Sequence, residues 1–321
     1  MENRQKWTDL IPDVGLRIAE VYDQGDEQYT PGIFSVLKQG SSVKAQDNFT
    51  GKTSFGKVSQ FEDGDDVPTI ERFKTYTTKV IYRNYGGAVE VTKNLIEDRD
   101  FESELDEMKD MSRSVNYSMD ESGAQLFNGG FATTVAVNGY DMTWYGDAKP
   151  QFSTIHPTVV PGGSTQSNAS STGIVLSHDN LETARLALMR QKTDNALAMG
   201  MAGQLTLVTS LDNEKLAKEI MGSDLTPQNA NNAINVFKGA MNLVSSTFLD
   251  TANGGLNTAW FLLNTSMLKM YQISRQEKRL ESDVNIRNKV ATYTVDARWA
   301  NCSKEWKGSW GSKGNLAAYS S

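Results

Sequence analysis

Residues 98–127, DRDFESELDEMKDMSRSVNYSMDESGAQLF, are the most informative segment of the chain for its fold. Apolar side chains recur in it near a 3.6-residue period between charged and polar neighbours, which predicts one amphipathic helix. A helix of this span is ~45 Å long at ~1.5 Å per residue. The apolar stripe is narrow and keeps no strict heptad, which favours a spine lying on a sheet over a coiled coil. Asp98 and Asp100 are expected to cap its start, and Asn128-Gly129-Gly130 to end it in a left-handed turn.

The segment before this helix reads as β-structure. Residues 49–83 predict a long hairpin, with one strand around 53–61, a turn at 62–66 and a second strand over 70–82. The hairpin is rich in Lys, Thr and Gly and has too little apolar surface to be stable alone. We therefore expect it to lie on something else. Residues 85–87 predict a further turn, and residues 1–48 an N-terminal arm with a short helix at 13–22.

The second half of the chain changes pattern after the Gly- and Ser-rich stretch 161–173, where we place a domain boundary. Asp179 is expected to cap a helix, with Glu182 completing a capping box. A helix at 211–221 and short strands complete a compact α/β domain, the strands being 205–209, 235–237, 241–245 and 259–263. Residues 284–310 return to β-structure.

Composition excludes several function classes. The net charge is −7, which argues against a protein that wraps nucleic acid on a basic face. Cys302 is the single cysteine, so no intrachain disulfide forms, as expected in a reducing compartment. The sequence has no secretory signal peptide at its start and no apolar run of ~18 residues.

Chemical motifs are also missing. His156 and His178 are the only histidines, and no His, Cys, Asp or Glu group has metal-ligand spacing. Both are expected to be structural, and Cys302 a small buried side chain. Gly51-Lys52-Thr53 lacks the context of a phosphate-binding loop and predicts a hairpin kink. The acidic tract 102–107 is the solvated first turn of the helix. We predict no catalytic, cofactor-binding or metal-binding residue, and no enzyme.

Several ordered segments resemble a known family. Residues 152–157 precede the Gly- and Ser-rich loop, and residues 181–192 form a helix after it. Residues 205–210 and 216–220 follow, and Asn231 to Gly239 completes the series. The chain resembles the major capsid proteins of tailed bacteriophages, most closely the Mu-like major head subunit group, over roughly residues 45–310.

The resemblance implies an α+β fold, the Hong Kong ninety-seven type of phage major capsid fold. It assigns residues 1–48 to the N-terminal arm and 49–83 to an extended β-hairpin loop lying over a neighbouring subunit. It assigns 84–178 and 284–321 to a peripheral domain with the spine helix 98–127. Residues 179–283 become the α/β axial domain.

The function implied is that of a structural head protein. Copies of the chain would self-assemble, as pentamers and hexamers, into an icosahedral shell enclosing double-stranded DNA without sequence-specific binding. The virion capsid would be assembled in the bacterial host cytoplasm. The implied partners are a separate scaffolding protein, because no long segment precedes the arm, a portal and decoration proteins, with no membrane and no cofactor. An encapsulin-like bacterial compartment shell is the alternative, and DNA or cargo enzyme inside the particles separates the two.

Overall fold

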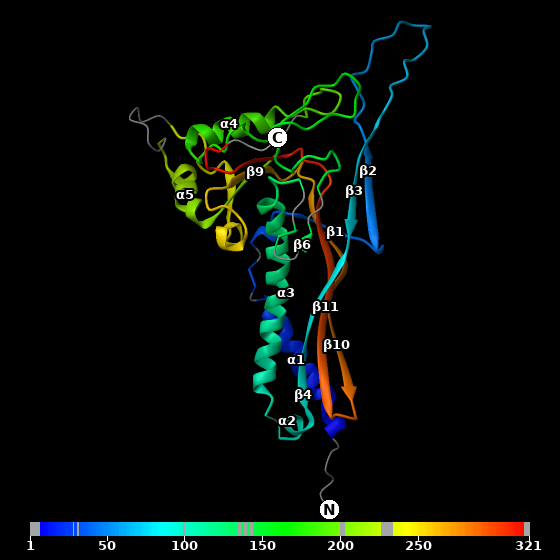
Figure 1. Ribbon diagram of the computed structural model, residues 1–321, viewed down its shortest axis with the longest axis vertical. Coiled ribbons are helices and arrows are strands. Elements are labelled where there is room, and N and C mark those ends of the chain that lie inside the picture. The colour runs from blue at the N-terminus through cyan, green and yellow to red at the C-terminus, as the bar shows by residue number, and fades with distance from the viewer. Residues whose placement is uncertain are drawn as a thin grey trace, which may run out of the picture.

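A computed structural model describes residues 7–27, 29–30, 32–98, 100–133, 136–137, 140–141, 144–199, 203–225 and 234–317. The fold is α+β and elongated (Figure 1). A long narrow sheet with two helices along it forms one end, and a smaller sheet with two helices forms the other. A two-stranded hairpin projects from the region where these parts meet.

The long sheet has the strand order β1-β10-β11-β4. β1 (Lys38–Ser41) runs parallel to β10 (Met270–Asn285), and β10, β11 (Val290–Ser303) and β4 (Arg83–Thr92) are antiparallel. Burial alternates along β11, as a strand with one face on the core requires. Gly86 and Gly87 lie inside β4 and not in the predicted turn. A Cβ on Gly86 would stand 2.6 Å from the Val295 carbonyl oxygen, so the glycine serves close strand packing.

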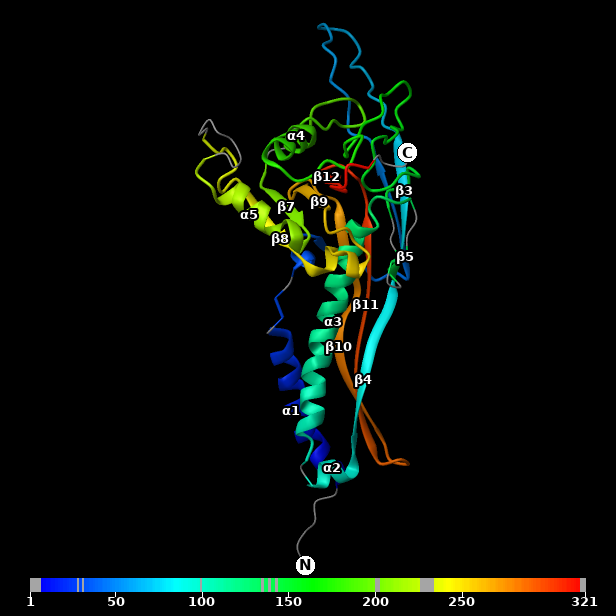
Figure 2. The ribbon, with the colours of Figure 1, turned by 60° about the vertical axis from the view of Figure 1, so that its left-hand side comes forward.

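Helix α3 (Glu102–Asn128) is the predicted spine and lies along the long sheet beside α1 (Trp7–Glu27) (Figure 2). The core between them includes Ile18, Met108 and Tyr293, each buried. α1 extends well beyond the predicted 13–22 and contains Pro12 and Gly15, because its apolar face packs on the sheet. The short helix α2 (Lys93–Asp98) precedes the spine as a separate turn.

Both expected caps of the spine differ from the structure. Phe101 occupies the N-cap position without a side-chain cap, so Asp98 and Asp100 do not cap α3. Gly129 at its C-terminal end has a right-handed φ of −79°, not a left-handed one. The end of the helix is instead buried in the main core, where Leu126 and Phe127 are fully enclosed. Tertiary packing thus fixes where this helix stops.

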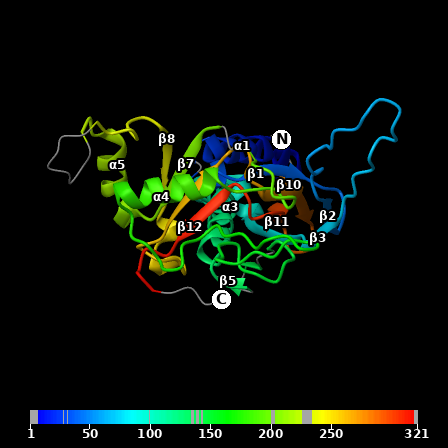
Figure 3. The same cartoon turned by 90° about the horizontal axis from the view of Figure 1, so that it is seen from above.

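The smaller sheet has the order β12-β9-β7-β8. Its strands are β7 (Leu205–Thr209), β8 (Met241–Ser245), β9 (Trp260–Asn264) and β12 (Ser309–Ser312). Helices α4 (His178–Met189) and α5 (Glu214–Gly222) pack beside it, as the view from above shows (Figure 3). Ser177, whose Oγ accepts from the Asn180 N–H, caps α4 in place of the predicted Asp179. The predicted strand 235–237 is wrong: Asn235 leads into a turn, and its side chain donates to the Ser223 carbonyl.

The remaining elements are short. They are β5 (Ala136–Val137), β6 (Tyr140–Asp141) and single 3₁₀ turns at Ile33–Ser35, Leu211–Asn213, Thr247–Leu249 and Thr251–Asn253. The strand pairing also corrects the expected division at residue 283. β10 belongs to the long sheet from Met270 onward, because it pairs with β11 over its whole length. β12 returns to the smaller sheet through its pairing with β9.

The projecting hairpin consists of β2 (Gln46–Lys52) and β3 (Lys74–Ile81), which pair only with each other. The expected strand at 53–61 is absent, and β2 lies earlier in the chain. The register shifts between Thr50 and Lys52, so the Gly51-Lys52-Thr53 segment is a strand irregularity, as predicted. Residues 53–73 form a long loop beyond the strands, called the hairpin loop below.

Candidate assembly surfaces

The hairpin loop, residues 53–73, extends away from both sheets (Figure 1). Apolar side chains along it face solvent, with exposed fractions of 57% for Phe55, 76% for Val58, 50% for Phe61 and 71% for Val67. Isolated exposed apolar residues are ordinary, but a series on one projecting segment marks an interaction surface. The sequence pattern showed a hairpin poor in aliphatic residues, and two phenylalanines and two valines make up its exposed apolar surface.

Few contacts hold the outer part of this loop. The Asp65 N–H donates to the Glu62 carbonyl at 3.1 Å, and Gly64 adopts a φ of +94°, which forms the turn predicted at 62–66. At the base, the Thr53 N–H donates to the Phe73 carbonyl at 2.9 Å, and Arg72 Nε donates to the Thr53 carbonyl at 2.7 Å. Between these points the backbone makes no hydrogen bond to another backbone group in the described part of the chain.

The root of the hairpin is anchored much more firmly. Lys304 Nζ lies 3.7 Å from the Phe49 ring centroid and 4.0 Å from that of Tyr271, so one cation joins the hairpin to the long sheet. Asn195 donates to the Ser54 carbonyl. The Tyr76 and Tyr145 rings meet edge to face at 5.5 Å. The loop therefore projects in a fixed direction from a rigid base.

A buried charge cluster lies beside this root. Lys307 Nζ lies 3.0 Å from Asp194 and 2.9 Å from Glu305, which also pairs with Lys269. Burial alone would raise the pKa of Glu305, but Lys307 and Lys269 hold it below its ordinary value. Burial alone would lower the pKa of Lys307, but Glu305 and Asp194 raise it above its ordinary value. These groups line a cavity of about 500 Å³. The sequence gives no sign of the cluster, because Asp194 and Lys307 come from distant segments.

The two histidines and the cysteine occupy structural positions. His156 is buried, with Nδ1 2.7 Å from Asp147 and its ring stacked on Trp306 at a centroid distance of 4.3 Å. His178 begins α4, with its ring edge to face on Phe237. Cys302 is fully buried, and burial raises the pKa of its thiol to about 12. The structure does not bring these three residues together into one site.

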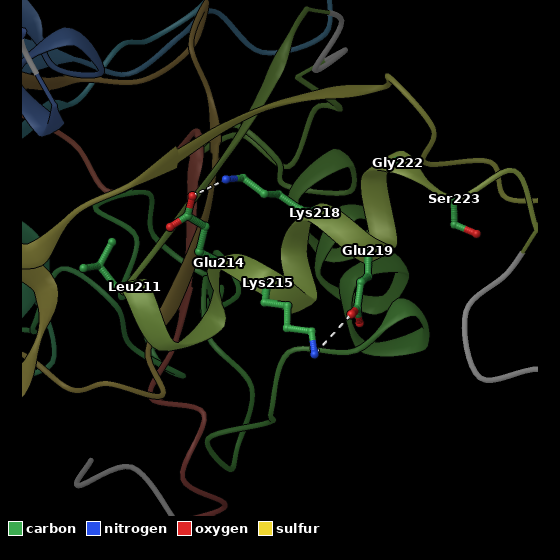
Figure 4. A pocket seen from close by; sticks show the side chains of 7 residues that line it. All are labelled: Leu211, Glu214, Lys215, Lys218, Glu219, Gly222 and Ser223. Carbon is green, nitrogen blue, oxygen red and sulfur yellow. Dashed lines mark hydrogen bonds and ion pairs between the residues drawn. The ribbon is translucent and has the colours of Figure 1, made fainter.

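A second exposed surface lies on α5, at the far end of the smaller sheet. A shallow depression of about 880 Å³ is lined by Leu211, Gly222 and the charged face of the helix. Figure 4 shows the side chains that line it. Glu214 pairs with Lys218, and Lys215 lies 3.8 Å from Glu219. The Lys218 hydrogen bond lowers the pKa of Glu214. Leu225, Ile234 and Val236 are exposed nearby, at 45%, 82% and 69%. Charged and apolar side chains at this tip suit contact with other protein and form no catalytic arrangement.

Within the described residues, no group of three or more His, Cys, Asp or Glu side chains is placed to hold a metal ion. Among the helices that the structure describes, none is long and apolar enough to cross a membrane.

Comparisons with known proteins bear on these surfaces. The model of the phage capsid protein family matches residues 75–308, well over half of the chain. A search of curated proteins found no match. Solved structures share the fold at low identity. The capsid of the cyanophage P-SCSP1u has a TM-score of 0.54 at 11% identity, covering 88% of this chain and 89% of that chain.

Two further capsids are similar. The capsid of an empty GTA particle has a TM-score of 0.51 at 10% identity, covering 88% of this chain and 89% of that one. The capsid of bacteriophage JBD30, decorated with minor capsid protein trimers, has a TM-score of 0.50 at 15% identity. The match covers 70% of this chain and 92% of that chain. These likenesses support the α+β phage capsid fold. The family match favours a phage capsid protein over the encapsulin alternative.

Proposed function

Since the chain belongs to the phage capsid protein family, we propose that it self-assembles, as pentamers and hexamers, into the icosahedral shell of a phage head that encloses double-stranded DNA. As a major capsid protein it is a structural subunit. The observation that carries the assembly proposal is the hairpin loop, whose four exposed apolar side chains lie on a segment that makes few contacts with the rest of its own subunit beyond its base. Burial of such a surface against neighbouring copies is the physical basis of stable obligate interfaces.

Each part of the subunit has a proposed place in the shell. We assign α3 with strands β4, β10 and β11 to the peripheral domain, and the smaller sheet with α4 and α5 to the axial domain around the vertices. The hairpin loop reaches a neighbouring subunit, and residues 1–48 serve as the N-terminal arm. The exposed tip of α5 supports the axial placement, because it offers charged and apolar side chains for contact with other copies.

Finer assignments rest on the family resemblance. We propose that the chain is closest to the Mu-like major head subunits, because the segments between residues 152 and 239 follow one another in the order that this group uses. Its proposed partners are a separate scaffolding protein, a portal and decoration proteins, and its place of assembly is the host cytoplasm. No catalytic role is proposed for any residue.

Electron microscopy of the expressed protein tests the assembly proposal. We expect closed particles of several megadaltons, or pentamers and hexamers, in native preparations. A monomer that persists at micromolar concentration in physiological salt, with and without coexpressed scaffold, would overturn it. Nucleic acid extracted from particles purified from infected cells tests the enclosed cargo, because a cargo enzyme in place of DNA would point to a compartment shell.

A further inference from the structure

We propose that the cavity at the root of the hairpin, called the root cavity below, binds a small phosphate-class oxyanion such as inorganic phosphate or pyrophosphate. The root cavity has a volume of about 500 Å³, and its lining comes from the hairpin root, the 193–199 segment and residues 304–307. That volume lies in the range of small-molecule sites. The inference concerns a ligand site within one subunit, so it goes beyond the proposed function and does not depend on shell assembly.

The root cavity carries an excess of positive charge. Its charged lining residues are Lys52, Lys269, Lys304, Lys307, Asp194 and Glu305. Four ammonium groups against two carboxylates leave a formal net charge of +2. Both carboxylates already pair with lysines of the buried charge cluster, Lys307 and Lys269. The remaining positive charge therefore attracts an anion from solution.

Lys52 and Lys304 are the cations left over, since neither has an acidic partner among the residues that the structure describes. Lys304 Nζ lies 3.7 Å from the Phe49 ring centroid and 4.0 Å from that of Tyr271. The two rings hold the ammonium group in place without neutralising its charge. An ammonium group has three donors and no acceptor, so Lys304 can still donate to an anion in the cavity.

The hairpin wall of the root cavity offers a further donor and open space. Ser54 lines the cavity, and its hydroxyl is buried without a hydrogen-bond partner in the described part of the chain. A buried hydroxyl of this kind calls for a water or an ion as its partner. Gly51 lies at the register shift of β2, and a Cβ there would stand 2.9 Å from Thr75 Oγ1 on the same wall. The glycine therefore keeps this wall open.

The root cavity gives the Gly51-Lys52-Thr53 segment a use that its sequence context does not predict. A phosphate-binding loop needs a helix after it, whereas this segment leads into the hairpin loop. Recognition here rests instead on lysines from distant parts of the chain, Lys52 and Lys304. Lysine binds phosphate as a point charge without fixed geometry. The site should therefore favour multivalent oxyanions over monovalent carboxylates.

Calorimetric titration of the native protein tests the site, in chloride buffer of constant ionic strength. We expect pyrophosphate to bind more tightly than inorganic phosphate, and acetate not to bind. Lys52→Gln should weaken pyrophosphate binding by about tenfold, as expected for the loss of one charge-assisted hydrogen bond. Lys52→Arg should retain binding. Lys79→Gln is the matched control, because Lys79 is also an exposed lysine of the hairpin but does not line the cavity.

Ser54→Ala should weaken pyrophosphate binding by about threefold, and a thermal melt of each variant without ligand checks that the fold is intact. No binding of pyrophosphate at millimolar concentration would overturn the proposal. Equal losses in Lys52→Gln and Lys79→Gln would also overturn it, because they would show general charge screening. Binding of a short single-stranded DNA without binding of pyrophosphate would overturn the assignment to a free oxyanion. Electron microscopy reads shell assembly separately, so failure of this site leaves the proposed function intact.

Discussion

His156 Nδ1 lies 2.7 Å from Asp147 Oδ2, and both side chains are almost fully enclosed. The other ring nitrogen lies 3.1 Å from Asn168 Oδ1. The Asn168 amide is held in this orientation because its Nδ2 donates to the Gln151 carbonyl and its Oδ1 accepts from the Ser153 N–H. Both imidazole nitrogens therefore lie within hydrogen-bond distance of buried side-chain oxygens. This buried hydrogen-bonded group fastens the 144–168 segment beside Trp306.

His156→Ala should destabilise the subunit by about 2–3 kcal/mol, because it leaves the buried Asp147 side chain without this hydrogen-bond partner. Thermal or urea unfolding of the free subunit measures the loss. His178→Ala is the control, and we expect about 1 kcal/mol or less there. Adding Asp147→Asn to His156→Ala should recover part of the loss, since no buried charge remains. A loss no greater than that of His178→Ala would contradict a stabilising role for the His156–Asp147 hydrogen bond.

Val115→Pro should abolish soluble, assembly-competent subunit. Proline at this position in α3 removes the N–H and clashes with the carbonyl of Met111, at ~3 kcal/mol or more. Soluble yield, circular dichroism and particle formation measure the effect. Val115→Ala keeps the helix and serves as the control. Normal assembly of Val115→Pro would mean that the helix is not needed as one continuous spine.

Trypsin should cut the free subunit early at Lys57 and Arg72, because the outer hairpin loop has little internal hydrogen bonding. In assembled particles the same cuts should slow greatly, while cuts in exposed loops change little. Limited digestion of both states, read by mass spectrometry, makes the comparison. Equal cleavage in the two states would show that the hairpin loop is not an intersubunit element.

Replacement of residues 58–70 by a short Gly-Ser turn should prevent closed shells and leave the smaller sheet folded. That sheet has its own core, which includes Leu207, Trp260 and Leu262, and the removed residues contribute nothing to it. Electron microscopy reads shell closure, and the thermal melt of the free subunit reads folding. A normal yield of closed shells from this variant would contradict the role of the loop in joining subunits.

Cys302 should resist thiol reagents in the folded subunit. Burial raises its pKa to about 12, so at pH 8 the thiol stays protonated, and only the thiolate is nucleophilic. A chromogenic disulfide reagent should give no reaction with native protein and one thiol per chain in guanidinium. Lys57→Cys is the positive control, because its thiol lies on the exposed loop. Rapid reaction of native Cys302 would show that this part of the core opens.

The spine helix could be predicted from sequence because its apolar period is local. The turn at 62–66, the strands 205–209 and 241–245 and the burial of Cys302 followed from local signals in the same way. Errors arose where distant contacts overrode local preference. Gly86 and Gly87 read as a turn, but their missing side chains allow β4 to pack tightly against β11 and α3. α1 passes through Pro12 because its buried face lies on the sheet.

The sequence alone was enough to predict the α+β class, the long spine, the lack of local catalytic or metal motifs, and a long hairpin with too little apolar surface to be stable alone. Periodicity, turn residues and missing ligand spacing are properties of neighbouring residues, so they can be read along the chain. The folded structure was needed to show that β10 and β12 belong to different sheets, that Lys307 meets Asp194 and Glu305, and that β4 is an edge strand. These features depend on contacts between distant segments, such as Lys307 and Asp194, which are 113 residues apart. Local sequence preference does not predict such contacts.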